Sequence, residues 1–192
     1  MKQTTNQLIN DLIDRTKAVM NTIDKFQNLS EEELNWKENP NSWSVLECIE
    51  HLNLYGDFYL PELQKRIQAA PKSKQVNFRS GWLGNYLATS MLPKEQLNKM
   101  KTFKDKDPSG STLSKSVLER FVEQEKTLLE LLHTASEMNL TKVRTATTLP
   151  LIKLRLGDTL RFVIYHHQRH IVQAERVLNM LKQQKNATSS IP

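Results

Sequence analysis

Three of the five histidines of this chain lie within one short stretch, YHHQRHIVQ, which runs from Tyr165 to Gln173. His166 and His170 are four residues apart, and side chains at this spacing lie on the same side of a helix. Two imidazoles placed in this way can bind one metal ion, with metal–nitrogen bonds of about 2.0–2.1 Å in the case of zinc. His167 and His170, three residues apart, form a competing pair. The stretch therefore predicts part of a metal site and leaves the choice of pair open.

A further ligand must come from another part of the chain, and the remaining histidines are His51 and His133. His51 lies at the edge of the apolar face of a predicted helix, on the side of Tyr55, from where it can reach across a helix–helix interface. His133 lies near the end of another predicted helix, where a cation suits the helix dipole, so we expect it to cap that helix or contact solvent. Cys48 could serve as a soft ligand, but we interpret it as a small, buried core residue.

Other polar residues near the histidines have two readings each. Gln173 follows His170 by three positions, and it could hydrogen-bond a histidine or a ligand beside the metal or serve as an ordinary interhelical amide. Glu47 follows Ser44 at the spacing of a capping box, so we interpret it as a helix-capping residue and not as a catalytic acid. Tyr55 could donate a proton to a leaving group, but we expect a packed aromatic side chain.

The elements that must position these residues are long helices. Apolar residues recur at helical spacing in four stretches, which cover about residues 5–26, 44–70, 113–136 and 156–184. A capping box formed by Ser44 and Glu47 marks the start of the second helix, and Pro61 within it predicts a kink if that helix is continuous. Ser30 and Glu33 have the same spacing and predict a short helical turn after the first helix.

Two long connections complete the expected fold. Residues 71–110 are less regular and include SGWLGNYLATSMLP, which predicts a short helix, and residues 139–154 are rich in threonine and predict an extended connection. We therefore expect an all-α, antiparallel four-helix bundle with long connections between helices two and three and between helices three and four. A single domain is expected over residues 1–184, followed by a disordered tail over residues 185–192.

Composition narrows the possible partners and compartments. The formal net charge is +6 and the sequence pI is about 9.4, but lysines and arginines are spread along the chain, which argues against nucleic-acid binding. The N-terminus is polar instead of having the apolar centre of a signal peptide, and no apolar run is long enough to span a membrane. A single cysteine excludes an intramolecular disulfide and fits a reducing compartment, so we expect a cytoplasmic protein.

Two segments resemble the signatures of the DinB-like superfamily, also called DinB/YfiT. SWSVLECIEHL, from Ser42 to Leu52, is similar to the first signature, a Trp-Ser pair followed by an acidic residue and a histidine. HHQRHIVQ, from His166 to Gln173, is similar to the second signature, two histidines four apart followed by a glutamine. Residues 101–132 and 154–178 also resemble one bacterial branch of this superfamily, so the resemblance covers nearly the whole chain.

The resemblance implies a four-helix bundle in which three histidines hold a divalent metal ion. Carried over by position, the ligands are His51, His166 and His170, and His167 matches no ligand position. Zinc or nickel is the expected metal, with manganese or iron as alternatives. The sequence departs from the common pattern at Ile171 and Val172, where an Arg-Gly pair is frequent.

For function, the resemblance implies metal-dependent transfer of a low-molecular-weight thiol, or a related isomerisation or hydrolysis, on a small-molecule substrate. The alternative is a non-catalytic metal-binding bundle with a structural or partner-binding role. A homodimer is expected by analogy between folds of this type.

Overall fold

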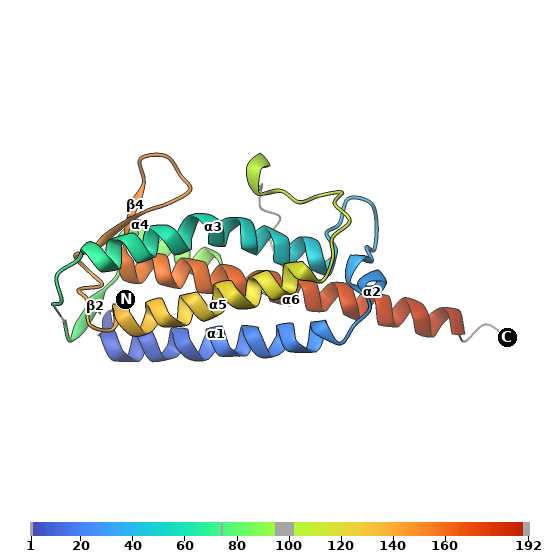
Figure 1. Cartoon of the computed structure of the whole chain (residues 1–192), viewed down its shortest axis with the longest axis horizontal. Coiled ribbons are helices and arrows are strands. Elements are labelled where there is room, and N and C mark those ends of the chain that lie inside the picture. The colour runs from blue at the N-terminus through green and yellow to red at the C-terminus, as the bar shows by residue number, and fades with distance from the viewer. Residues whose placement is uncertain (1, 74, 95–101, 190–192) are drawn as a thin grey trace.

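The structure is a computed structural model that describes residues 2–73, 75–94 and 102–189, and helices dominate it (Figure 1). The α-helices of this part of the chain are α1 (Thr5–Gln27), α2 (Glu31–Asn35), α3 (Val45–Ala69), α4 (Trp82–Ser90), α5 (Ser116–Ala135) and α6 (Leu156–Ser189). A short 3₁₀ helix, η1, covers Lys104–Lys106. The expectation of an all-α fold is confirmed, and the short helices α2 and α4 come in addition to the four long ones.

The four long helices form a bundle in which α1 and α3 each pack against both α5 and α6. The colours in Figure 1 show that α1 and α6 run in one direction along the bundle, whereas α3 and α5 run in the other. The expected antiparallel arrangement is therefore wrong for the neighbouring pair α3 and α5. The long connection between Ala69 and Ser116 explains the difference, because it contains α4 and returns the chain to the end of the bundle where α3 begins.

Capping boxes define the starts of three helices. The pairs are Thr4 with Gln7 at α1, Ser30 with Glu33 at α2, and Ser44 with Glu47 at α3. In each pair the first side chain accepts a hydrogen bond from the backbone of the second residue, and the second side chain bonds back, so two otherwise unpaired N–H groups are satisfied. Helix α3 continues through Pro61. The kink at that residue stays a prediction.

Two small antiparallel ladders close the bundle at one end. Strand β1 (Lys2–Thr4) pairs with β2 (Asn77–Arg79), and β3 (Arg144–Ala146) pairs with β4 (Lys153–Arg155). The β3–β4 pair lies within the connection that was expected to be extended. A strand of three residues is too short to show an alternating apolar pattern, so the sequence does not indicate these ladders.

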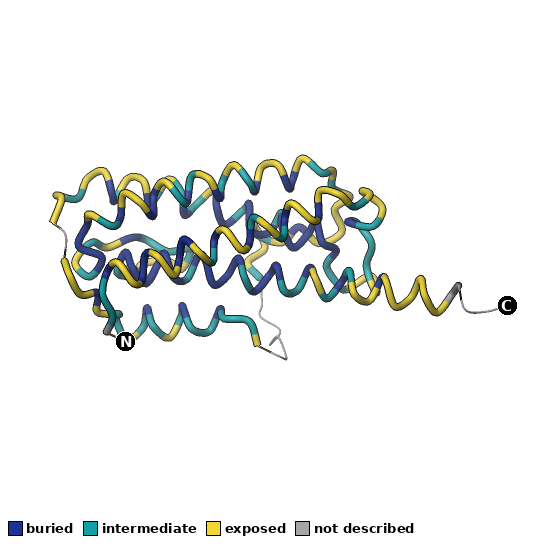
Figure 2. The backbone as a smooth tube through the Cα atoms, turned by 90° about the horizontal axis from the view of Figure 1, so that it is seen from below, coloured by how far each residue is buried: buried dark blue, intermediate teal, exposed yellow. Residues whose placement is uncertain are grey.

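Helix α6 extends to Ser189 and projects beyond the rest of the bundle (Figure 2). The expected disordered tail is therefore helical over residues 185–189, and the remaining residues of that tail lie outside the described part of the chain. No glycine or proline interrupts the chain between Gly157 and Pro192, so nothing stops the helix at Gln184. Lys185 also forms an ion pair with Glu33 of α2, with 2.8 Å between Nζ and Oε1.

Buried apolar residues form two separate clusters along the bundle. On α3, Tyr55 belongs to the first cluster and Leu52 to the second. On α6, Tyr165 belongs to the first cluster and Ile171 to the second. The two clusters therefore meet at the level of the histidines on α3 and α6. None of the described helices has the length and apolar character that crossing a bilayer requires.

Candidate metal centre

His51 of α3 and His166 and His170 of α6 lie together in the interior of the bundle. The Nε2 atom of His166 is 3.2 Å from Nε2 of His51 and 3.0 Å from Nε2 of His170. One ring nitrogen from each residue lies within 4.8 Å of the others. Among the described residues, these three histidines form the one group of side chains that could hold a metal ion. All three side chains are buried. The packing of α3 against α6 thus brings together residues from two distant segments.

The hydrogen bonds on the outer side of this cluster determine where its protons are. Nδ1 of His51 lies 2.7 Å from the carbonyl oxygen of Lys106, and Nδ1 of His170 lies 3.0 Å from Oε1 of Gln173. Because these oxygens only accept hydrogen bonds, both Nδ1 atoms are donors, and a neutral imidazole then has a lone pair on Nε2.

Protons alone cannot satisfy the facing nitrogens. A proton on Nε2 of His166 could be donated to His51 or to His170, but the second lone pair would then have no donor. A divalent cation between the three Nε2 atoms would satisfy all of them, so the residues present fit a metal ion.

The electrostatic environment keeps these imidazoles neutral. Burial lowers the pKa of His51 to about 4, although its hydrogen bond to Lys106 acts in the opposite direction. Burial, and after it the neighbouring imidazoles, lowers the pKa of His166 and of His170 well below the usual range. Neutral imidazole is the form that binds metal ions, so the cluster is in a ligating state at neutral pH.

Three aromatic rings, those of Trp43, Tyr55 and Phe162, pack against the imidazoles. The ring centroid of Trp43 lies 4.8 Å from that of His51 and 5.8 Å from that of His170. The ring of Tyr55 lies 4.9 Å from His51 and 4.8 Å from His166. Burial raises the pKa of Tyr55 to about 12, so its hydroxyl keeps its proton at neutral pH. The position of Trp43 next to Ser44 in the first signature was the one sequence signal that could have indicated its contact with the histidines.

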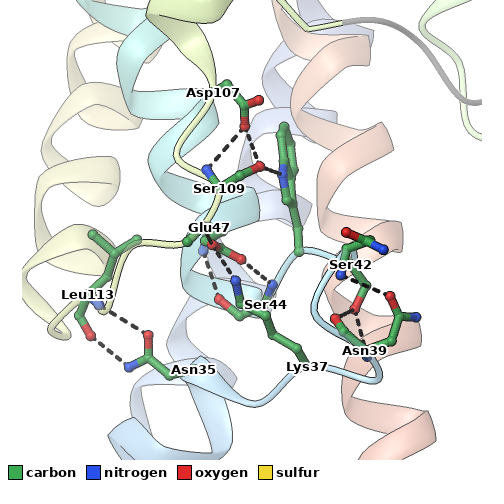
Figure 3. A network of polar contacts seen from close by, with 12 residues as sticks. Asn35, Lys37, Asn39, Ser42, Ser44, Glu47, Asp107, Ser109 and Leu113 are labelled. Carbon is green, nitrogen blue, oxygen red and sulfur yellow. Dashed lines mark hydrogen bonds and ion pairs between the residues drawn. The ribbon is translucent and has the colours of Figure 1, made fainter.

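Residues 102–113, which we call the covering segment, lie against the side of the site where His51 and Trp43 are. Besides the carbonyl of Lys106, this segment provides Ser109, whose Oγ accepts a hydrogen bond from Nε1 of Trp43 at 2.7 Å. The Ser109 hydroxyl in turn donates to Oδ1 of Asp107 at 2.5 Å (Figure 3). The covering segment therefore holds both a histidine and the aromatic ring beside it. A backbone carbonyl on a loop has no signature in the sequence, and for this reason sequence reasoning missed Lys106.

Glu47 anchors the covering segment to the start of α3. Its Oε1 accepts hydrogen bonds from the backbone of Gly110 at 2.7 Å and from Nζ of Lys37 at 2.6 Å (Figure 3). Nearby, the amide of Asn35 exchanges two hydrogen bonds with the backbone of Leu113, at 2.7 and 3.1 Å. The capping role expected for Glu47 is confirmed, but the same buried carboxylate also connects two segments that are distant in sequence.

The other candidate ligands lie outside the cluster. Nδ1 of His167 lies 2.8 Å from Oε1 of Glu125 on α5, and both side chains are buried. Cys48 is a fully buried member of an apolar cluster, where burial raises the pKa of its thiol. His133 is exposed near the end of α5. The competing pair of His167 and His170 therefore does not converge on one point, whereas His166 and His170 do.

Comparison with known proteins adds a family assignment. Residues 13–174 match the family described as the DinB superfamily, and this range includes His51, His166, His170 and Gln173. No curated protein and no solved structure matches the chain. Because the match extends over most of the 192 residues and agrees with the helical bundle, the chain belongs to the DinB superfamily.

Proposed function

We propose that His51, His166 and His170 bind one divalent metal ion through their Nε2 atoms, and that the protein is a metal-dependent enzyme. The reaction is the transfer of a low-molecular-weight thiol to a small electrophile, or the hydrolysis of a small substrate. The observation that carries the proposal is the convergence of three neutral Nε2 atoms, of which two have lone pairs that no protein donor can satisfy together.

Three nitrogen ligands leave one position of a tetrahedral metal free, which is the arrangement of catalytic zinc sites. A metal bound here would act as a Lewis acid that makes a bound water or thiol more acidic. The residues of the chain have orienting roles. Lys106 and Gln173 hold His51 and His170 in the tautomer whose lone pair is on Nε2, and Trp43 and Tyr55 pack against the imidazole rings.

The identity of the metal follows from the ligand type. Imidazole nitrogen suits zinc and nickel, and it also binds iron; manganese prefers oxygen ligands and ranks behind them. The proposal therefore takes zinc or nickel first. It also includes a small substrate, because the buried site leaves little room for a large one. A cytoplasmic location is consistent with the single cysteine, and a homodimer is proposed by analogy between folds.

A second candidate function is supported by the position of the cluster. The three histidines lie where the two apolar clusters meet, so a metal there could serve to join them, without catalysis. Such a protein would lose much of its thermal stability on chelation but would show no turnover.

The test combines elemental analysis with an activity screen on protein purified without a histidine tag. The expected result is close to one equivalent of zinc or nickel per chain, together with turnover of at least one thiol-plus-electrophile pair or one small ester or amide. Stoichiometric metal without any turnover would favour the structural role. Protein that contains no metal and binds none on titration would contradict both proposals.

A further inference from the structure

A second site of a different chemical kind lies at the end of the bundle where α6 begins. A pocket of about 280 Å³ is lined there by Gly81 and Trp82 from the start of α4, by Arg144, Lys153 and Arg155 from β3 and β4, and by Asp158 of α6. Asp158 precedes His166 by eight positions, which corresponds to about 12 Å along a helix axis. The pocket is therefore separate from the candidate metal centre.

The β3–β4 ladder concentrates positive charge at this pocket. Arg144 lies directly opposite Arg155 in the ladder, and Lys153, two residues before Arg155, projects on the same face. Like charges opposite each other destabilise a strand pair. Within residues 2–73, 75–94 and 102–189, Arg144 and Lys153 take part in no ion pair or side-chain hydrogen bond, and Arg155 donates from Nη1 to the carbonyl of Arg79. The protein thus holds three cations together at the pocket without acidic partners for them.

The one carboxylate of the lining does not neutralise this charge. Asp158 is fully buried and accepts hydrogen bonds from the hydroxyl of Ser80 and from the backbone of Gly81, the latter at 2.8 Å. Its remaining partner is the buried guanidinium of Arg161, with 3.3 Å between Nη1 and Oδ1. Asp158 is therefore already paired inside the protein, and the pocket presents a net positive charge to a ligand.

Trp82 gives the pocket an apolar surface. Its side chain is 86% exposed, which is a high value for the largest apolar side chain, and an exposed indole offers a flat face on which a planar group can stack. Arginine and lysine side chains are the usual ligands of phosphate groups. We propose that this pocket binds a small phosphate monoester, with the phosphate between Arg144, Lys153 and Arg155 and its planar organic part against Trp82.

The test is titration of the full-length protein with inorganic phosphate and with phenyl phosphate. Calorimetry and tryptophan fluorescence measure the binding. We expect phenyl phosphate to bind at least about five-fold more tightly than inorganic phosphate, because ring stacking contributes on the order of 1 kcal/mol or more. Arg144→Ala and Lys153→Ala should each weaken both ligands about five-fold or more. Trp82→Ala should abolish only the preference for phenyl phosphate.

Four controls make the experiment decisive. Lys17→Ala removes an exposed lysine of α1, and Tyr86→Ala removes an aromatic ring that is 64% exposed one turn beyond Trp82; neither should change binding. Treatment with a chelator should also leave binding unchanged, because the proposed phosphate site contains no metal. Phosphate bound to a metal at the histidines would instead be lost. A short single-stranded oligonucleotide should bind no more tightly than phenyl phosphate.

The opposite results would overturn the proposal. They are an absence of phenyl phosphate binding at about 10 mM, an equal loss of affinity in Lys17→Ala, or a loss of binding after chelation. Tighter binding of the oligonucleotide that depends on Arg144 and Lys153 would make the pocket a nucleic-acid contact. None of these outcomes bears on the metal content of the protein, so this test fails or succeeds independently of the proposed metal centre.

Discussion

The Nε2 atoms of His51 and His166 lie 3.2 Å apart, although 115 positions separate the two residues in the sequence. The contact depends on the packing of α3 against α6 and on the hydrogen bond that orients His51 toward Lys106. His51 and His170 both direct a lone pair toward Nε2 of His166, which can donate a proton to only one of them, and this is why the site is expected to respond to metal.

Removing His51 should reduce metal affinity as strongly as removing His170. We expect His51→Ala to weaken zinc or nickel binding by more than about 100-fold. Removing a residue that only hydrogen-bonds to a metal ligand typically weakens binding by about 10–100-fold, and the loss of a ligand itself should weaken it more. Competition with a chelator of known affinity measures the change. His133→Ala is the matched control, because His133 is exposed and lies outside the cluster. An unchanged affinity in His51→Ala would remove that residue from the site.

Gln173 should contribute less to metal affinity than a metal ligand does, but more than a surface amide does. Its Oε1 lies 3.0 Å from Nδ1 of His170, so Gln173→Ala should free the imidazole to change tautomer and weaken metal binding about ten-fold or more. Gln183→Ala, which changes an exposed glutamine of the same helix, should have no effect in the same competition measurement. If both variants bind metal like the wild type, Gln173 is an ordinary interhelical amide.

Trp43 should report metal binding through its fluorescence. Its ring lies 4.8 Å from the ring of His51, so a paramagnetic ion such as nickel at the histidines should quench its emission. We expect the signal change on nickel titration to disappear in Trp43→Phe and to persist in Trp82→Phe, whose indole lies at the other pocket. Quenching that survives in Trp43→Phe would place the metal elsewhere.

The metal-free protein should become less stable as the pH falls. In the unfolded chain His51 takes up a proton at a pKa near 6.5, whereas in the folded protein burial lowers its pKa to about 4. Between these values the unfolded state binds more protons, so stability declines with falling pH, by about 2 kcal/mol between pH 7.5 and pH 5 for His51 alone. The free energy of unfolding in urea at pH 7.5 and at pH 5 measures the decline.

His51→Gln provides the comparison for the pH experiment. The variant cannot gain a proton at this position, so its stability should fall less between the two pH values than that of the wild type. His166 and His170, whose pKa values burial lowers in the same direction, would account for the decline that remains. Equal declines in both proteins would show that His51 is protonated in the folded state.

The parts of the fold and site that sequence could predict are those with a local physical signal. Ser44 and Glu47 predicted the start of α3 because a capping box needs only four consecutive residues. Helix periodicity reduced the ligands on α6 to two possible pairs, His166 with His170 or His167 with His170. The choice between these pairs and the addition of His51 needed a family resemblance, because helical spacing carries no information about which helices become neighbours. The carbonyl of Lys106 could not be predicted, since any residue type can provide a backbone acceptor.

The errors have physical causes of the same kind. The tail was expected to be disordered from residue 185 because chain ends are poorly ordered unless contacts fix them, yet Lys185 forms an ion pair with Glu33 from a distant helix. The parallel direction of α3 and α5 depends on the path of the connection through α4. Each of these features results from tertiary contacts and not from local propensity.

The separation of the apolar core into two clusters has a consequence for folding cooperativity. Hydrocarbon contacts couple each half of the bundle internally, but between α3 and α6 the boundary is occupied by buried imidazoles. A bridging ion there would make the two halves open together, whereas without it each could open as its own unit, with its own hydrogen-exchange protection. Metal occupancy would then determine whether this chain behaves as one cooperative folding unit or as two.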